Sequence, residues 1–202
     1  MPFLRHMTDA DKGYQRWEMD KKERLIKLIT ERAFRQTETP EITLSSGKKS
    51  CFYFNLKQVT CYSEGQFLVG GLIFERLATL SLAPDGIGGL TMGADPISFA
   101  VAHTFHLNGG KIEGFSIRKE PKAHGAGLQI EGHIKAGDTV VITEDVVTTG
   151  GSTIKAIKVA REHGLVVLGV VALLDRCEEN GRQNIEAQNV PVHSILTIRD
   201  FQ

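Results

Sequence analysis

Residues 140–153 read VVITEDVVTTGGST, and this stretch decides the fold. It opens on apolar, β-branched residues that predict a buried strand from Thr139 to Thr143. Two adjacent carboxylates, Glu144 and Asp145, follow the strand, and a helix is predicted from Ser152 to His163. In open α/β sheets the ligand binds at the carboxyl ends of the strands, so the acids and the turn after them are expected to face a ligand.

The turn between the acids and the helix has the composition of a phosphate-binding loop. Gly150 and Gly151 permit close backbone approach to a ligand, and N–H groups at a helix N-terminus favour an anion. Thr148, Thr149 and Ser152 add hydroxyl donors. No lysine follows the glycines, which excludes the GxxxxGK[ST] motif of nucleotide-binding loops. The alternative is an ordinary strand-to-helix turn with Ser152 or Thr149 as its N-cap.

The two acids need a different partner, because they would repel a bare phosphate. Ribose hydroxyls that donate hydrogen bonds to the carboxylates fit this position, as does a magnesium ion already held by the ligand.

The rest of the chain alternates short apolar runs with helical patterns. This alternation predicts an α/β fold with a central parallel sheet of about five strands flanked by helices. We expect one domain over residues 1–202, with a small N-terminal hood from about 20–62 and a core from about 64–202. The hood includes a hairpin-like segment outside the main sheet. Helices are expected at 20–35, 64–80 and 96–107, and further strands at 86–90, 111–117, 165–174 and 193–198.

Composition narrows the possible partners. The chain has 202 residues, with 24 Lys plus Arg and 24 Asp plus Glu, so its formal net charge is zero. A neutral chain gives no electrostatic reason to expect a nucleic-acid or membrane partner. The three cysteines form no CxxC pair, and no signal peptide or membrane-spanning run is evident. We therefore expect a cytoplasmic protein.

A second cluster of charge lies at residues 118–127, RKEPKAHGAG. Arg118, Lys119, Lys122 and His124 give this segment the most concentrated positive charge of the chain, and glycines follow them. Such a segment suits a mobile lid, of about residues 118–133, that closes over a leaving anion and excludes water. The alternative is a solvated surface loop with incidental charges.

The segment at 140–153 closely resembles the signature of type I phosphoribosyltransferases, which bind 5-phosphoribosyl 1-diphosphate (PRPP). By this resemblance the two acids contact the ribose hydroxyls, the following loop holds the 5-phosphate, and magnesium (Mg²⁺) enters on PRPP without a metal site of the protein's own. The implied PRPP-binding residues are Arg118, Lys119, Lys122, His124, Glu144, Asp145, Val146, Val147, Thr148, Thr149, Gly150, Gly151 and Ser152. The implied catalytic residues are Lys119, Lys122, His124 and Asp145.

Three other segments resemble the orotate phosphoribosyltransferases in particular. They are the lid pattern R-K-E-x-K-x-H-G, the stretch LSSGKKSCFYFN at 44–55, and the L-D-R sequence that ends at Arg176. The resemblance implies orotate binding by Thr148, Arg176, Tyr53 and Phe54. Arginine grips a carboxylate with two parallel hydrogen bonds, and orotate differs from uracil by its carboxylate. The alternatives are that the aromatic residues fill the core and that Arg176 pairs with Asp175 at the surface.

The resemblance also implies an activity and an assembly, and at two positions the sequence differs from some family members. The activity is transfer of phosphoribose from PRPP to orotate, giving orotidine 5′-monophosphate and pyrophosphate in de novo UMP synthesis. The assembly is a homodimer in which the lid reaches the neighbouring subunit. Residues 88–97 resemble the loop on the pyrophosphate side, but Ser45 and Gly93 stand where some family members carry lysine.

Two rival functions stay open. A phosphoribosyltransferase for a purine would share the PRPP signature, and steady turnover of adenine or hypoxanthine but not orotate would favour it. A PRPP-sensing transcriptional regulator would need a basic nucleic-acid-binding face or an added DNA-binding segment, and neither is evident in this sequence.

Overall fold

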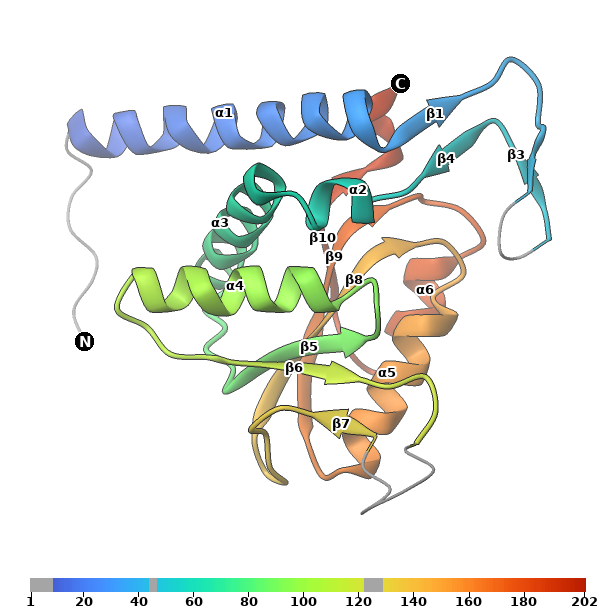
Figure 1. Cartoon of the computed structure of the whole chain (residues 1–202). Coiled ribbons are helices and arrows are strands. Elements are labelled where there is room, and N and C mark those ends of the chain that lie inside the picture. Colours follow the sequence, from blue (N-terminus) through green and yellow to red (C-terminus); the bar gives the residue numbers. More distant parts are fainter. Residues whose placement is uncertain (1–8, 44–46, 122–128) are drawn as a thin grey trace.

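The computed structural model describes residues 9–43, 47–121 and 129–202, and for residues 9–20 it describes the backbone alone. Figure 1 shows a central sheet with helices on both of its faces and a long helix, α1 (Asp9–Arg32), across the top. Within the described ranges, no helix combines the length and the apolar content that crossing a bilayer requires.

The central sheet has six strands in the order β10-β9-β8-β5-β6-β7, and neighbouring strands are parallel except for the β6–β7 pair. The predicted core of about five parallel strands is confirmed, and β7 is an additional antiparallel strand at the edge. The six strands are β5 Gly86–Leu90, β6 Glu113–Ile117, β7 Ile130–Glu131, β8 Thr139–Val147, β9 Val166–Asp175 and β10 Val192–Thr197.

Side chains alternate along each strand, and helices cover both faces of the sheet, so side chains on both faces are buried. Val141 points into one core cluster, which includes residues of α3 (Ser63–Thr79) and α4 (Asp95–Leu107). Val140 and Ile142 point into the other, which includes residues of α5 (Gly151–Glu162). This burial on both faces explains why the strands read as continuous apolar runs in the sequence.

The strand order reverses between β5 and β8, and this reversal positions the site. From β5 the chain passes through α4 to β6 on one side, and later places β8 on the other side of β5. In open α/β sheets ligands bind at such a reversal, in a crevice outside the carboxyl ends of the strands, so the ligand is expected at the carboxyl ends of β5 and β8.

Two small antiparallel sheets lie outside the main sheet. In one, β1 (Phe34–Gln36) pairs with β4 (Phe52–Phe54), and in the other β2 (Ile42–Thr43) pairs with β3 (Lys49–Ser50). The segment predicted to be hairpin-like, residues 42–60, supplies three of their four strands, but its last residues form helix α2 (Lys57–Thr60). We call residues 34–54 the hood. Figure 1 shows the hood at the end of the sheet where the arrowheads of β5 and β6 point.

Several predicted boundaries change. Helix α1 ends at Arg32, so the prediction that Phe34 is helical was wrong: this residue begins β1 and stacks on Phe54 at 4.8 Å between ring centroids. Strand β8 continues through both acids to Val147. Two helices were not anticipated, α2 (Lys57–Thr60) and α6 (Gly181–Glu186), and the chain ends in a 3₁₀ turn, η1 (Ile198–Phe201).

Candidate active site

The two acids lie at the carboxyl end of β8, and their neighbours differ. Glu144 is only 6% exposed, and its carboxylate accepts a hydrogen bond of 2.9 Å from the Thr153 hydroxyl on α5. Asp145 is partly exposed, and its Oδ1 accepts a hydrogen bond from the N–H of Val146. Asp145 is therefore the acid that a ligand in the crevice can reach directly, while Glu144 supports the start of α5.

Burial changes the proton affinity of Glu144. Removal from water, together with the nearby charge of Asp145, raises the pKa of this carboxyl to about 8. A buried acid beside a second acid holds its proton because two adjacent negative charges in a poorly solvated place are unfavourable. The pair thus carries less than two negative charges at neutral pH, which eases the approach of an anionic ligand.

The loop after β5 approaches Asp145 closely. A Cβ built at Gly93 would lie 2.6 Å from Oδ1 of Asp145, and one built at Gly89 would lie 2.2 Å from the carbonyl oxygen of Thr143. Neither position has room for a side chain beside the acids. The loop is also fixed internally, since the Thr91 hydroxyl donates to Asp95 at 2.6 Å. The backbone of this loop therefore packs closely against the acids at the carboxyl ends of β5 and β8.

The loop after β8 has the backbone that the glycine pair predicted. Gly150 adopts φ of +80°, a conformation that glycine tolerates best, and α5 starts at Gly151. Helix α6 supports the loop from behind: the Asn184 side-chain amide donates to the Thr149 carbonyl at 3.0 Å. A Cβ at Gly181 would lie 2.2 Å from the Thr148 carbonyl oxygen. Thr149, Gly151 and Ser152 remain exposed at the surface of this loop.

Arg176 follows β9 and is buried, with 3% exposure. Its Nε and Nη2 donate to the Glu178 carboxylate at 3.1 and 3.3 Å, and Nη2 also donates to the Ser50 hydroxyl of the hood at 3.0 Å. The alternative of a surface pair with Asp175 is wrong, because Asp175 pairs with Arg182 at 3.1 Å. The arginine thus links the sheet edge to the hood.

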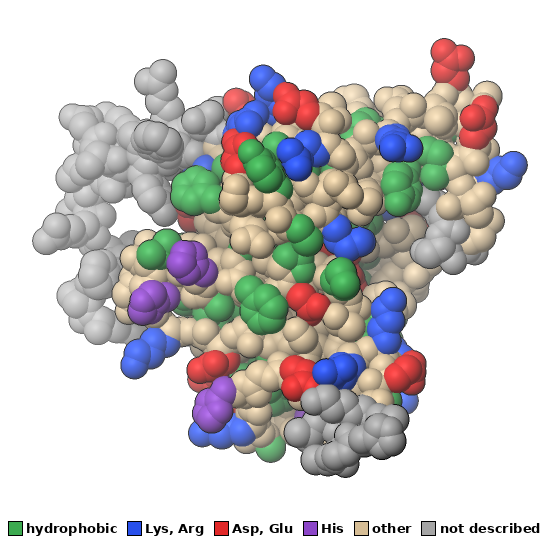
Figure 2. Space-filling view, in the orientation of Figure 1, with side chains coloured by type: hydrophobic (Ala, Val, Ile, Leu, Met, Phe, Trp, Pro, Cys, Tyr) green, Lys and Arg blue, Asp and Glu red, His purple; other side chains and the backbone are tan. Residues whose placement is uncertain are grey.

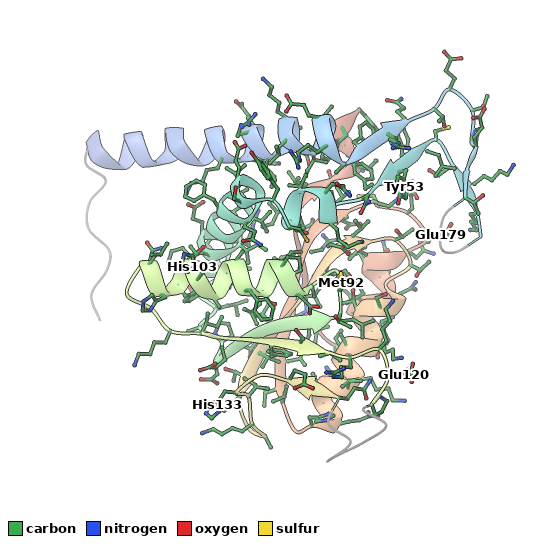
Figure 3. The ribbon with its side chains drawn as sticks, in the orientation of Figure 1. Tyr53, Met92, His103, Glu120, His133 and Glu179 are labelled. Carbon is green, nitrogen blue, oxygen red and sulfur yellow. The ribbon has the colours of Figure 1, made fainter. Side chains whose placement is uncertain are left out.

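Tyr53 and Phe54, two of the three aromatic residues of β4, have different surroundings. Tyr53 is 38% exposed, whereas Phe54 is 8% exposed and packs against Phe34 and Phe201. This packing favours the core-filling alternative for Phe54. In Figure 3, Tyr53, Met92, Glu120 and Glu179 lie toward the same end of the molecule, where the central strands finish. The hood, the loop after β5 and the first part of the lid therefore surround one edge of the sheet.

The predicted lid is described at its two ends. Arg118 pairs with Glu131 of β7 at 2.9 Å, and Glu120 pairs with Lys155 of α5 at 2.9 Å. Lys119 is exposed. The predicted lid residues Lys122 and His124 lie outside the described residues. The described first part of the predicted lid therefore contacts α5, the helix that follows the predicted phosphate-binding loop.

No family model matches the sequence. Comparison with curated proteins does find relatives: an orotate phosphoribosyltransferase of Aquifex aeolicus is 44% identical over 183 residues, which are 91% of this chain and 98% of that protein. The chain belongs to the orotate phosphoribosyltransferase family.

Solved structures agree with this membership. Orotate phosphoribosyltransferase of Mycobacterium tuberculosis, in complex with PRPP, has a TM-score of 0.71 and 29% identity, covering 89% of this chain and 98% of that one. A phosphoribosyltransferase of Corynebacterium diphtheriae has a TM-score of 0.76 and 32% identity, covering 90% and 98%.

Sequence reasoning about this orotate phosphoribosyltransferase site missed several residues. Glu178 and Ser50, which hold Arg176, were not singled out, although Ser50 belongs to the quoted LSSGKKS stretch. Asn184, which supports the phosphate loop, lies on the unpredicted helix α6. Lys57, 3.6 Å from Asp145, carried no motif of its own. These residues act through contacts between distant segments, and no spacing in the sequence reports such contacts.

Proposed function

We propose that this chain transfers the 5-phosphoribosyl group from PRPP to orotate, giving orotidine 5′-monophosphate and pyrophosphate. The observation that carries the proposal is the arrangement at one sheet edge of Asp145, the glycine loop before α5, and a buried arginine at the end of the next strand. The M. tuberculosis relative whose structure contains PRPP supports the identity of the donor.

In this proposal the donor binds at the carboxyl ends of β5 and β8. Its 5-phosphate accepts hydrogen bonds from the backbone N–H groups of residues 148–152, with hydroxyls of Thr148, Thr149 and Ser152 as further donors. Val146 is partly exposed and belongs to the same contact surface, whereas Val147 is 1% exposed and packs in the core, so the prediction that Val147 binds PRPP is not kept. The ribose hydroxyls donate to Asp145, and Glu144 keeps Thr153 and the start of α5 in place.

The acceptor binds under the hood. Arg176 recognises the orotate carboxylate, Thr148 contacts the base, and the exposed ring of Tyr53 stacks on it. Glu178 already engages two nitrogens of Arg176, which orients the guanidinium plane for a planar carboxylate. Phe54 contributes from the core, by holding β4 in position.

The reaction breaks the bond between the anomeric carbon and the diphosphate oxygen and forms a bond from that carbon to a nitrogen of orotate. Negative charge grows on the departing pyrophosphate, and cations around it lower the barrier. In the proposal, Arg118, Lys119, Lys122 and His124 of the lid supply such charge. No general base is required, since the acceptor nitrogen can enter as an anion.

Magnesium fits this site as an ion carried by the donor. Mg²⁺ usually binds through one or two carboxylates together with substrate phosphates, and Asp145 offers a carboxylate of this kind. Within the described residues, no three His, Cys, Asp or Glu side chains gather into a metal-binding group. When bound, Mg²⁺ would neutralise charge on the diphosphate.

The proposal includes a homodimer. Two helices, α3 and α4, expose the apolar side chains of Phe67, Phe99 and Leu107, at 67%, 51% and 70%. Phe67, Phe99 and Leu107 line a groove of about 330 Å³, and green side chains are visible over this face in Figure 2. Large apolar groups gathered on one face favour burial against another protein surface.

A cytoplasmic location belongs to the same proposal. Cys51, Cys61 and Cys177 are all free thiols in the structure, as expected in a reducing compartment.

The test is a spectrophotometric assay of the purified protein with PRPP, magnesium and orotate. The expected result is loss of orotate absorbance together with release of one pyrophosphate per orotate consumed. Parallel reactions with adenine and hypoxanthine serve as controls. Turnover of either purine with none of orotate would replace this proposal with the purine-specific rival.

A further inference from the structure

A lysine outside the lid reaches the acid pair. Lys57 begins helix α2, and its Nζ lies 3.6 Å from Oδ2 of Asp145. The lysine side chain is 46% exposed, whereas that of Asp145 is 14% exposed. In the described parts of the chain, no other ion pair joins a lysine or arginine to Glu144 or Asp145.

The backbone of α2 is firmly held. Leu56 and Val59 are fully buried, and a Cβ built at Gly65 would lie 2.0 Å from the carbonyl oxygen of Val59, so α3 packs directly on α2. The N–H of Gln58 donates to the carbonyl of Asn55 at 3.0 Å, which closes the turn into the helix. The backbone of Lys57 is therefore fixed, and the position of its ammonium group depends only on the conformation of the flexible side chain.

The opposite side of Asp145 cannot supply a cation from the loop after β5. Its Oδ1 faces Gly93, where a Cβ would already come within 2.6 Å. A lysine at position 93 would therefore collide with the acid. The ammonium of Lys57 lies near the other oxygen, Oδ2, at 3.6 Å.

We propose that Lys57 binds the diphosphate of PRPP and the pyrophosphate product. This inference rests on the proposed function. The distance of 3.6 Å is longer than a hydrogen bond, and a half-exposed ion pair of this kind is weak, so the ammonium can turn from Asp145 to a phosphate oxygen at little cost. Three N–H donors on a flexible stem suit a diphosphate.

Two other cations near the hood already have partners. Lys48 pairs with Glu179 at 2.6 Å, and Arg176 is held by Glu178 and Ser50. Lys57 therefore has both the proximity to the donor-binding acid and the freedom to change partners.

The test compares Lys57→Met, which removes the ammonium and keeps the stem, with Lys57→Arg, which keeps the charge. Lys158→Met is the control, because Lys158 lies on α5, is 76% exposed and pairs only loosely with Glu162, at 3.8 Å. Three quantities are measured for each protein: KM for PRPP, and the inhibition constants of pyrophosphate and of ribose 5-phosphate.

The Lys57→Met variant is expected to raise KM for PRPP and the inhibition constant of pyrophosphate by roughly 10- to 100-fold, the size of a lost charge-assisted contact. Ribose 5-phosphate carries no diphosphate, so its inhibition constant should stay within about twofold, and Lys57→Arg should restore most of the loss. Equal weakening of ribose 5-phosphate would show that Lys57 only positions Asp145, and unchanged pyrophosphate binding would likewise overturn the inference.

Failure of the proposed function gives a different result. In that case the unaltered protein would not consume orotate. Calorimetric titration with pyrophosphate alone would still compare pyrophosphate binding by Lys57→Met and by the unaltered protein. The melting temperatures of the variants are measured as well, and Lys57→Arg keeps the comparison valid if the methionine variant proves unstable.

Discussion

At the scale of single residues, the adjacent acids of β8 have unlike environments. Glu144 lies under α5 with a raised pKa, while Asp145 faces the crevice and Lys57. From the sequence, the same role was assigned to both acids, because both follow the same apolar strand. Consecutive residues of a strand point to opposite faces, so one of two neighbouring acids is expected to be covered.

Glu144 makes protein stability depend on pH. Its pKa is raised from 4.5 in the unfolded chain to about 8 in the folded protein, so the folded state holds the proton over this range. This group therefore stabilises the fold fully below pH 4.5, and its contribution falls as pH rises toward 8, by at most about 1.4 kcal/mol per pH unit. Glu144→Gln should remove this dependence. Urea unfolding of both proteins from pH 5 to 8 measures the free energy of unfolding at each pH. The same change of this free energy with pH in both proteins would contradict the prediction.

Arg176 is predicted to select the acceptor. Arg176→Ala should raise KM for orotate by roughly 10- to 100-fold, which corresponds to loss of charge-assisted hydrogen bonds, with KM for PRPP changed by less than about threefold. Arg161→Ala, a surface change on α5 whose guanidinium donates to the Gln188 carbonyl, is the control. Steady-state kinetics with each substrate varied would refute the assignment if both KM values rose equally.

At the scale of elements, aromatic packing anchors the hood. The ring of Phe201, in the last turn of the chain, lies 5.6 Å from that of Phe34 and 5.2 Å from that of Phe54. These contacts join β1 and β4 to the C-terminus, while Ser50 and Lys48 join β3 and the residue before it to the segment after β9. The hood is thus fixed to the sheet at two places.

Removing the aromatic anchor should loosen the hood. Phe201→Ala is predicted to lower the free energy of unfolding by about 2 kcal/mol, less than for a fully buried phenylalanine because Phe201 is half-buried. It should also raise KM for orotate, since the hood carries Tyr53. Gln202→Ala, at the exposed last residue, is the control. Denaturant unfolding that gives the same midpoint for Phe201→Ala and for the unaltered protein would contradict the anchor.

The elements differ in how far the sequence could predict them. Strands β8 and β9 were predictable because burial on both faces demands apolar runs, and β5 was predictable as a shorter run of the same kind. Helix α5 was predictable because glycine and hydroxyl residues precede it. Helix α6 could not be predicted: it is six residues long, it follows a left-handed Asn180, and its place depends on packing against the phosphate loop. The contact between Arg176 and Ser50 joins residues 126 positions apart, which no local pattern encodes.

At the scale of the whole molecule, the reversal of strand order explains why one edge carries the site. Strands β5 and β8 are neighbours in the sheet, yet their connections leave in opposite directions, so the loop after β5 and the acids of β8 meet at Gly93 and Asp145. The loop after β5 leads directly into α4, so the α3–α4 face adjoins this edge. Met92, which is 65% exposed, lies in that loop.

The homodimer is tested on that face. Phe67→Glu combined with Phe99→Glu should convert a dimer to a monomer, since two charges would be buried in an apolar interface. If the lid completes the neighbouring site, kcat should fall with the dimer. Light scattering after gel filtration gives the mass, with Val166→Glu at another exposed apolar position as control. A monomeric unaltered protein, or a double variant that stays dimeric, would contradict the predicted interface.

The most direct measurement is a crystal structure of the protein with PRPP and magnesium. The 5-phosphate should lie on the backbone N–H groups of residues 148–152, with the ribose hydroxyls on Asp145 and the diphosphate near Lys57. PRPP bound at any other place, with the carboxylate of Asp145 facing bulk water, would contradict the account.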